Sequence, residues 1–575
     1  MIDTTNTTNK PGRYFLPQEL KVNSWDEIKP FFDNLVEREI GTEEDLRKWF
    51  RDRSELEAVI SENLGWRYIR MTTDTSNEEY VEDYKNFIQN IQPHISPYSD
   101  KLNKKAVESE YLKKIEKDKA YFILSRGMKE SIKIFREENI PLQTKAQTKS
   151  QEYGSITGAM TIELNGEELT LQQAGDFLLS PDRDLREKVY KKISERRLQD
   201  KSKLDDIFND LINLRDQMGK NAGFKNYRDY KFSAMGRFDY SVEDCFAFHD
   251  SVSKEVVPLL NKMAERRKET LNVDPLRPWD KSVDPEGNTP LKPFEGGEEL
   301  LEKTIKVFDQ LDPYLGKCLV RMKEMGHLDL ESRKGKAPGG YNYPLSETGV
   351  PFIFMNATTK LRDMVTLLHE GGHAVHSFLA NDLELTDFKH TPSEVAELAS
   401  MSMELLTMDH WDIFFTNQEE LKRAKKEHLE QIIQTLPWVA TIDKFQHWIY
   451  ENPGHTVEER DAEWVKIFNE FADNVTDWSG LEKYRKNLWQ RQLHLFEVPF
   501  YYIEYGMAQL GAVAVWKNFK EDNKQGLNNY KNALKLGYTK SIPEIYEAAG
   551  VSFDFSSEYI SELMSFVNDE LNKIV

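Results

Sequence analysis

The residues with the clearest chemical potential are the run His369-Glu370-Gly371-Gly372-His373, in which two histidines stand four residues apart. On an α-helix, residues four apart lie on one face, so both imidazoles can reach one metal ion. Zinc accepts histidine nitrogen as a ligand, and a catalytic zinc site keeps one position for water. Glu370 follows the first histidine directly, where it can reach a metal-bound water and act as a general base.

The motif alone does not explain why two glycines stand in the middle of a helix, or what role the nearby His376 has. A glycine in the middle of a helix costs about 1 kcal/mol relative to alanine. Close approach of a substrate strand would be one reason for Gly371 and Gly372. A chance match on a surface helix is the alternative interpretation of the whole motif. His376 lies on nearly the same face as His373, and is either a hydrogen-bond partner of the site or a bystander.

Acidic and histidine side chains downstream supply candidates for a third ligand. Residues 391–393, Thr-Pro-Ser, predict the start of a second helix that is otherwise largely apolar. Carboxylates on such a helix are costly to bury unless they are paired or bound to a cation. A helix with one solvated edge is the alternative, and spacing alone does not separate Glu394 from Glu397. The candidates are Asp382, Glu384, Asp387, His390, Glu394, Glu397 and Glu404.

Long amphipathic segments must position these residues, because apolar side chains recur in them at helical spacing. Pro258 should break one of these segments, and Ser180-Pro181 predicts the start of a helix. Alternating apolar residues before Asn165-Gly166 predict a β-hairpin, and residues 350–355 predict a short strand. The chain is therefore expected to be mostly helical with a small amount of sheet. The amphipathic segments are 42–60, 79–91, 112–136, 185–218 and 242–271.

Composition limits the classes of partner. The 575 residues include 77 Lys and Arg against 98 Asp and Glu, a net charge of −21. A field of that sign repels phosphate groups, which argues against nucleic acid and anionic membranes as partners. No apolar run approaches the about twenty residues that a membrane-spanning helix needs, and no signal peptide is expected. Two cysteines, Cys245 and Cys318, favour a reducing cytoplasm.

Longer stretches around the motif carry a specific resemblance. They are Thr366-Leu-Leu-His-Glu-Gly-Gly-His-Ala-Val-His376, then Ala396-Glu-Leu-Ala-Ser400 with Glu404, and upstream Gly339-Gly-Tyr341 and Pro351-Phe-Ile-Phe-Met-Asn356. Together they resemble the oligoendopeptidase F and thimet oligopeptidase family of zinc peptidases. The family's third ligand, a glutamate on the following helix, corresponds to Glu397, and Glu404 matches an acid behind the ligands. Leu398 stands where the family usually has Ile or Val. Asn342 stands where the family often has Cys, so thiol-dependent behaviour is not implied.

A third match lies near the C-terminal end, in His494-Leu-Phe-Glu-Val-Pro-Phe-Tyr501-Tyr502-Ile-Glu-Tyr505. From the residues alone, these tyrosines would be ordinary core aromatics. The resemblance implies instead that His494, Tyr502 and Tyr505 donate hydrogen bonds to the substrate carbonyl and the developing oxyanion, a role that needs preorganised donors. The role of Tyr501 stays open.

The resemblance, which covers about residues 200–560 well, implies a two-lobed, neurolysin-like helical fold with a deep central channel and a little sheet near the active site. We expect an N-terminal helical region over 1–200 and a catalytic domain over 201–575. The implied activity is that of an endopeptidase with one zinc per chain, which cleaves short unstructured peptides by Glu370-assisted attack of zinc-bound water. A helical zinc carboxypeptidase and an inactive peptide-binding relative are the alternatives, and the oligomeric state is not predicted.

Overall fold

The computed structural model describes residues 12–574, which divide into two compact units, each built from three separate stretches of chain. Unit 1 contains the stretch that ends at Phe135, together with Leu291–Lys425 and Ala508–Phe553. Unit 2 contains Arg136–Pro290, Lys426–Met507 and the stretch that begins at Asp554. The division falls within two helices, α19 (Gln418–Glu451) and α23 (Ile503–Glu521).

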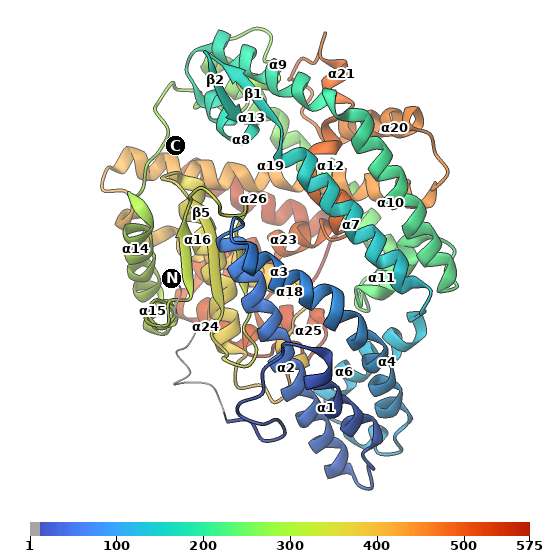
Figure 1. Ribbon diagram of the computed structural model, residues 1–575. Coiled ribbons are helices and arrows are strands. Elements are labelled where there is room, and N and C mark those ends of the chain that lie inside the picture. The colour runs from blue at the N-terminus through green and yellow to red at the C-terminus, as the bar shows by residue number, and fades with distance from the viewer. Residues whose placement is uncertain (1–11, 575) are drawn as a thin grey trace. The chain divides into compact units, whose positions relative to one another are not determined.

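Unit 1 is mostly helical and contains the three-stranded sheet (Figure 1). A π-helical turn, Phe87–Ile91, joins α3 to α4, and a 3₁₀ segment, Met408–Ile413, follows α18. Its other elements are α1 (Trp25–Glu37), α2 (Glu43–Thr73), α3 (Glu78–Asn86), α4 (Gln92–Glu108), α5 (Leu112–Ile115), α6 (Lys119–Ile134), α14 (Gly296–Leu311), α15 (Pro313–Glu324), β3 (Leu328–Glu331), β4 (Tyr341–Tyr343), β5 (Phe352–Ala357), α16 (Leu361–Leu379), α17 (Thr386–Lys389), α18 (Ser393–Leu406), α24 (Asn523–Leu534) and α25 (Ile542–Ala548).

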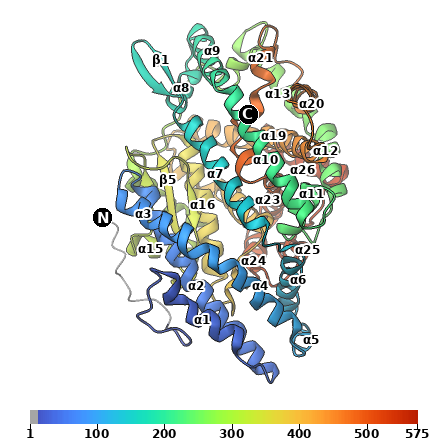
Figure 2. The ribbon, with the colours of Figure 1, turned by 45° about the vertical axis from the view of Figure 1, so that its right-hand side comes forward.

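Unit 2 is also mostly helical, and its helices α7 and α10 lie side by side in both ribbon views (Figures 1 and 2). The predicted fold class, mostly α with a small amount of sheet, is confirmed for the described residues. The channel and the boundary near residue 200 stay predictions. The elements of unit 2 are α7 (Asn139–Gly158), β1 (Thr161–Leu164), β2 (Glu167–Thr170), α8 (Leu171–Asp176), α9 (Arg183–Gln199), α10 (Lys201–Asn221), α11 (Tyr227–Ala234), α12 (Val242–Glu255), α13 (Val257–Leu271), α20 (Val457–Phe471), α21 (Glu482–Arg485), α22 (Leu493–Glu497) and α26 (Ser557–Ile574), with short 3₁₀ segments at Phe177–Leu179, Pro278–Asp280 and Leu488–Arg491.

The sheet of unit 1 fixes where the motif helix begins. Its strand order is β3-β5-β4, with β5 parallel to β3 and antiparallel to β4. The predicted strand is thus confirmed as the central one, and most of its residues are buried because α16 packs beside it and Ile69 of α2 packs against Phe352 and Phe354. Helix α16 begins after three intervening residues. There the Asp363 carboxylate accepts hydrogen bonds from the Thr358 backbone N–H (2.8 Å) and from the Lys360 backbone N–H.

The predicted hairpin and helix break are both present in unit 2. Strands β1 and β2 pair through Asn165 and Gly166, whose φ angles of 56° and 87° suit the tight turn of a two-residue hairpin. Helix α12 ends at Glu255 and α13 begins at Val257, so Pro258 occupies the first turn of a new helix, where its missing N–H costs nothing.

Several sequence-based boundaries are wrong, and two of them show why. Helix α9 begins at Arg183 rather than at Pro181, because the Asp182 side chain accepts hydrogen bonds from the N–H groups of Asp184 and Leu185 and so acts as the N-cap. The predicted segment 185–218 is two helices, which are separated at Asp200.

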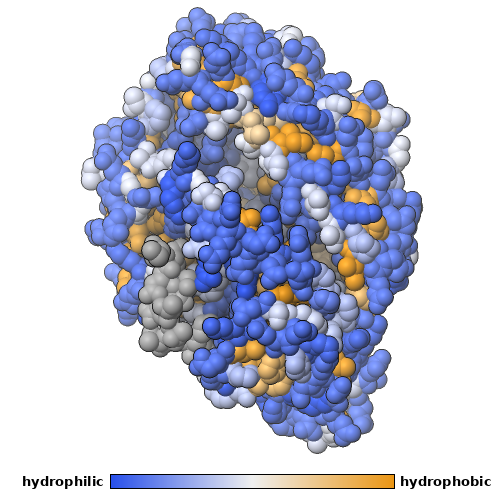
Figure 3. All heavy atoms as spheres, viewed as in Figure 1, coloured by the Kyte–Doolittle hydropathy of each residue, from blue (hydrophilic) through white to orange (hydrophobic). Residues whose placement is uncertain are grey.

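The largest cluster of buried side chains in the N-terminal helices is aromatic and aliphatic, and includes Trp49, Phe50 and Tyr121 together with Phe388 of α17. The face shown in Figure 3 is mostly hydrophilic, with its hydrophobic side chains in small separate patches, as the charge content leads us to expect. None of the helices among residues 12–574 combines the length and the apolar character that crossing a membrane requires.

Candidate metal centre and catalytic residues

Helix α16 carries the histidine motif and presents His369 and His373 on one face. Their ring centroids lie 4.9 Å apart and their planes are nearly perpendicular, at 88°. The two side chains are 21% and 19% exposed, whereas most of the second half of the helix is buried. The two imidazoles are therefore held in place by packing and still accessible to solvent.

Glu397 of α18 lies against both histidines. Its Oε2 atom is 3.3 Å from His369 Nε2 and 3.7 Å from His373 Nε2. Each of the three side chains offers one ligand atom, and these atoms all lie within 4.8 Å of one another. Glu394, one turn earlier and also buried, is not part of this group. The structure therefore distinguishes two acids that helical spacing could not.

The other downstream candidates lie apart from this group. Glu384 accepts hydrogen bonds from Arg51 (3.2 Å) and from the Tyr121 hydroxyl (3.1 Å), and His390 Nε2 lies 3.4 Å from Ser346 Oγ. Neither Asp382 nor Asp387 belongs to a group of possible metal ligands among the described residues.

The glycines of the motif allow α16 to pack closely inside unit 1. A Cβ atom on Gly372 would lie 2.7 Å from Ser400 Cα and 2.9 Å from the Ala399 carbonyl oxygen, both in α18. A Cβ atom on Gly371 would lie 2.6 Å from the Phe308 ring. The close approach that the glycines permit is thus made by α18 and Phe308, whereas a substrate strand was the expected neighbour.

Glu404 and Ser400 orient the two ends of the group. His369 Nδ1–H donates to Glu404 Oε1 over 2.6 Å, so Nε2 is the ring nitrogen that faces Glu397. Ser400 Oγ donates to Glu397 Oε2 over 3.0 Å. Such outer partners fix the tautomer and the orientation of side chains that bind metals.

The charges of the group are strongly coupled. Burial alone would raise the pKa of the Glu397 carboxyl, but the hydrogen bond from His369 and the charge of both histidines lower it to about 2. Burial acts to lower the pKa of His369, and its bonds to Glu397 and Glu404 outweigh burial and raise it well above the usual value. Burial lowers the pKa of His373 to about 4. The protein groups alone therefore place a proton on His369, a positive charge that a divalent cation can replace.

Glu370 directly follows His369 on the helix and is buried, but it is not one of the three grouped side chains. Burial raises the pKa of its carboxyl to about 7. Asn342 Nδ2, from β4, donates to the backbone oxygen of Glu370 over 3.3 Å. The residue that departs from the family's usual cysteine thus supports the backbone of the motif helix.

His376 is buried, and its Nε2 atom has no hydrogen-bond partner among residues 12–574. Burial lowers its pKa to about 3, so the ring is neutral at physiological pH. Of the two roles that the sequence left open, this geometry favours a bystander over a partner of the grouped side chains.

The C-terminal aromatic cluster consists of His494, Tyr501, Tyr502 and Tyr505, all partly exposed and all in unit 2. The His494 ring centroid lies 4.9 Å from that of Tyr502 and 5.9 Å from that of Tyr505, and the two tyrosine centroids are 5.5 Å apart. The structure therefore brings these predicted residues together. They belong to a different compact unit from His369, so their part in one active site stays a prediction.

A hydrogen-bonded chain that the sequence did not reveal fixes the tautomer of His494. Trp438 Nε1, which can only donate, bonds to Gln492 Oε1 over 3.1 Å. The Gln492 amide nitrogen therefore faces His494 and donates to its Nδ1 atom over 2.7 Å. In the neutral ring the proton then lies on Nε2, so that nitrogen is a hydrogen-bond donor.

Two further residues missed by sequence reasoning hold the start of the tyrosine cluster. Phe500 has φ = 68°, an unfavourable value for a bulky residue. Its N–H donates to Gln446 Oε1 over 2.6 Å, and Arg237 donates to its carbonyl oxygen and to Glu504. These buried bonds compensate the strained turn that leads into Tyr501. No sequence motif marks Arg237 or Gln446.

Comparison with known proteins identifies the family. Residues 177–565 match the family described as peptidase family M3, and residues 15–135 match the peptidase M3 N-terminal domain. The chain belongs to peptidase family M3. The predicted resemblance to oligoendopeptidase F is thereby confirmed, and the chain is a peptidase.

Relatives of this M3 chain include an oligoendopeptidase F homolog of Borreliella burgdorferi, which is 23% identical over 88% of this chain and 86% of that protein. The oligopeptidase PepF of Bacillus subtilis is 23% identical over 61% of this chain, and the match spans only 52% of that protein. Among solved structures, PZ peptidase A with an inhibitor is 28% identical, with a TM-score of 0.89 and 98% of each chain covered. Oligoendopeptidase F of Enterococcus faecium, 18% identical with a TM-score of 0.65 over 96% of this chain and 97% of that one, shares the fold.

The packing of α16 on α18 generates a stability test. Gly372→Ala forces a methyl group into the α18 backbone, and overpacking of this kind costs about 1 to 3 kcal/mol of unfolding free energy. Gly127→Ala in α6 is the matched control, because no atom lies within 4 Å of its Cβ position. The control should gain about 0.5 to 1 kcal/mol from improved helix propensity. Denaturant unfolding measures both, and equal stabilisation of the two variants would contradict the close packing.

Proposed function

We propose that this M3 peptidase is a zinc-dependent endopeptidase that hydrolyses internal bonds of short unstructured peptides. The observation that carries the proposal is the convergence of His369, His373 and Glu397, from two packed helices, with one ligand atom each within 4.8 Å of the others. Two imidazoles and one carboxylate are the ligand set of many catalytic zinc sites. We assign one zinc per chain to this group.

The geometry fits the ion. Two ligands about 2.1 Å from a tetrahedral zinc lie about 3.4 Å apart, and the separations from Glu397 Oε2 to the two Nε2 atoms are 3.3 and 3.7 Å. The partial exposure of both histidines leaves a side of the group open to solvent and substrate. When bound, zinc supplies Lewis acidity and lowers the pKa of a coordinated water.

We assign Glu370 as the general base. A base is most effective when its pKa lies near the working pH, and burial raises that of Glu370 to about 7. In this proposal Glu370 takes a proton from the attacking water and passes it to the leaving amine. Glu404 holds His369 in the tautomer that presents Nε2.

His494, Tyr502 and Tyr505 are proposed as donors to the substrate carbonyl and the oxyanion. Supporting observations are the partial exposure of all three side chains and the Gln492 bond that leaves a proton on His494 Nε2. A negative tetrahedral oxygen needs donors of this kind. Tyr501 packs against both His494 and Tyr505 and receives no catalytic role.

The substrate class rests on relatives whose names are oligoendopeptidase and oligopeptidase. An internally quenched peptide with an acetylated N-terminus and an amidated C-terminus tests it. We expect cleavage at an internal bond, abolished by a strong chelator and restored by zinc. A carboxypeptidase would leave this peptide intact, and an inactive binding protein would bind it without turnover. The two free cysteines support the predicted cytoplasmic location.

The ligand assignment predicts different effects for two neighbouring acids. Glu397→Gln should lower the zinc content of purified protein by about one ion per chain, because a neutral amide is a poor zinc ligand. Glu394→Gln, an equally conservative change on the same buried helix face, should keep its zinc. Elemental analysis of the folded variants measures this, and zinc loss in the Glu394 variant alone would transfer the ligand role to that residue.

The assignment of Glu370 predicts that binding and turnover separate. Glu370→Gln should retain zinc and bind peptide, yet lose at least about 10⁴ in kcat, the upper range for loss of a general base. Steady-state kinetics, zinc analysis and peptide-binding calorimetry on one preparation check this. A variant that loses its zinc would show that Glu370 is structural or a ligand.

The oxyanion assignment predicts a kinetic effect without loss of stability. Tyr502→Phe or Tyr505→Phe should lower kcat by about 10² to 10³ with little change in KM, as for removal of one oxyanion donor. A core tyrosine that loses an ordinary hydrogen bond would instead cost about 0.5 to 1.5 kcal/mol of stability. Tyr501→Phe is the milder control. Wild-type kcat in both variants, with zinc retained, would make the cluster a packing feature.

A further inference from the structure

We propose a second, structural zinc site inside unit 2, with Cys245, Asp443 and His447 as its ligands. This group lies outside the motif and uses none of the residues assigned to catalysis. Each of the three side chains offers one ligand atom, and these atoms all lie within 4.8 Å of one another. The proposal does not depend on the proposed peptidase mechanism.

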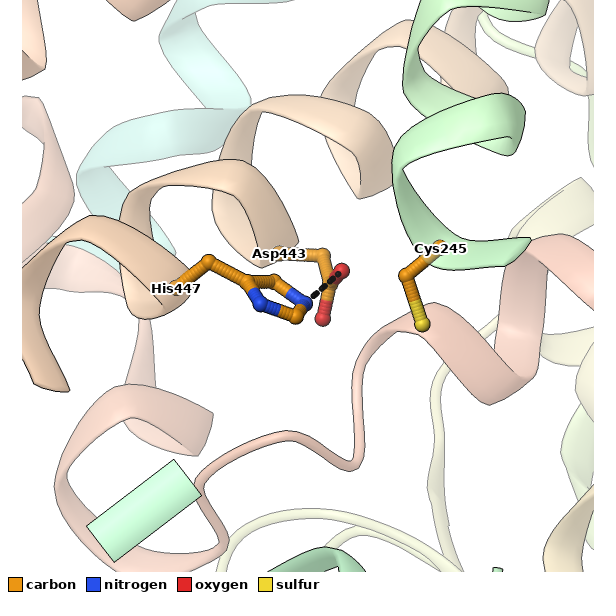
Figure 4. Close-up of side chains that lie close together, drawn as sticks. All are labelled: Cys245, Asp443 and His447. Atoms are coloured by element: carbon orange, nitrogen blue, oxygen red, sulfur yellow. Dashed lines mark ion pairs between the residues drawn. The ribbon is translucent and has the colours of Figure 1, made fainter. Parts of the chain in front are cut away.

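Two pairs of residues with helical spacing converge here. Cys245 and His249 stand four apart on α12, and Asp443 and His447 stand four apart on α19. Residues with this spacing share a helix face, so the two helices present four potential ligands to each other. Figure 4 shows Asp443 and His447 on one helix and Cys245 on the other, with the carboxylate between the imidazole and the thiol.

The separations match those of the candidate catalytic group. Asp443 Oδ2 lies 3.2 Å from His447 Nε2, comparable to the 3.3 Å between Glu397 Oε2 and His369 Nε2. The Asp443–His447 contact does not have hydrogen-bond geometry, and His447 Nε2 has no hydrogen-bond partner among the described residues. Two ligand atoms of one tetrahedral zinc lie about 3.4 Å apart and do not bond to each other. Asp443 Oδ2 and His447 Nε2 have a similar arrangement.

Several polar atoms of the group need a partner. Asp443 and Cys245 are fully buried, and His447 is 2% exposed. Asp443 Oδ1 and both ring nitrogens of His447 have no hydrogen-bond partner within residues 12–574. Buried polar atoms almost always have a partner in folded proteins. Aromatic rings of Phe246 and Phe500 pack against His447 at centroid distances of 4.9 and 5.3 Å, and they offer no hydrogen-bonding atom.

His249 supports the group from outside. Its Nε2 atom lies 2.9 Å from Asp443 Oδ2, where an Nε2–H can donate to the carboxylate. A carboxylate that binds a metal is usually hydrogen-bonded in this way.

The donor set selects the ion. Sulfur, imidazole nitrogen and carboxylate oxygen together suit zinc, whereas magnesium and calcium prefer oxygen alone. The Cys245 thiol, which donates to the Ser241 carbonyl oxygen over 3.4 Å, must release its proton to solvent when it binds. A thiolate, a carboxylate and a divalent cation then sum to zero charge, which burial favours. A water molecule completes the four ligands, because His249 keeps its bond to Asp443.

The burial assigns a structural role. A Cys–His–Asp nucleophilic triad would need an accessible sulfur, and Cys245 has no exposed surface. A closed zinc site would instead hold α12 against α19, since structural zinc contributes directly to folding free energy. The ligands of this site are buried, whereas His369 and His373 are partly exposed. An ion bound here should therefore exchange with solvent more slowly than an ion bound at His369 and His373.

Cobalt substitution provides a readout that the catalytic group cannot give. Protein produced in cells grown with cobalt should show a thiolate-to-cobalt charge-transfer band, because Cys245 is a ligand here and the His369 group contains no sulfur. Cys245→Ser should abolish the band and lower the metal content by about one ion per chain. Cys318→Ser is the control, because Cys318 is the second cysteine and is buried in unit 1. This variant should keep both the charge-transfer band and the metal content.

The catalytic variant separates the two metal proposals. Wild-type protein should contain about two zinc ions per chain, and Glu397→Gln should contain about one. When it is produced with cobalt, the Glu397→Gln variant should keep the charge-transfer band. A wild-type protein without that band, and with a metal content that Cys245→Ser leaves unchanged, would overturn the proposal and make the group a hydrogen-bonded network. If Cys245→Ser does not fold, the wild-type and Cys318→Ser spectra decide, because a band in both can come only from Cys245.

Discussion

The candidate active site depends on the close packing of α16 on α18. Gly372 brings the α18 backbone near enough for Glu397 to reach both histidines, and Ser400, which touches Gly372, also donates to Glu397. The same packing lets Glu404 reach His369. One contact surface thus sets the position of the group and of its supporting bonds. It also explains why Gly372 is tolerated in a helix, despite about 1 kcal/mol of lost propensity.

Buried charge is the second constraint, and the two units meet it in similar ways. In unit 1 the Glu397 carboxylate faces two imidazoles that are about one-fifth exposed, so the group is open to solvent and substrate. In unit 2 the Asp443 carboxylate also faces two imidazoles, His249 and His447, but here every member is fully or almost fully buried. A similar set of donor atoms therefore suits a catalytic site in unit 1 and a structural site in unit 2. The two sites differ in how far their side chains are exposed to solvent.

Local patterns predicted the local parts of the structure well. The motif helix, the hairpin turn at Asn165-Gly166 and the break before Pro258 each follow from short-range rules. Glu397 was separable from Glu394 only through family resemblance, because the choice depends on how α18 rotates against α16. Contacts between distant residues were not predictable. His249 and Asp443 are 194 residues apart, and neither the Cys245 pair nor the Asp443 pair forms a known motif.

X-ray diffraction from crystals, measured on both sides of the zinc absorption edge, tests the central claim most directly. We expect an anomalous peak about 2.0 to 2.2 Å from His369 Nε2, His373 Nε2 and a Glu397 carboxylate oxygen. A peak bonded to Glu394 in place of Glu397 would contradict the ligand assignment. The absence of any peak at these histidines, in crystals grown with zinc, would contradict the account as a whole.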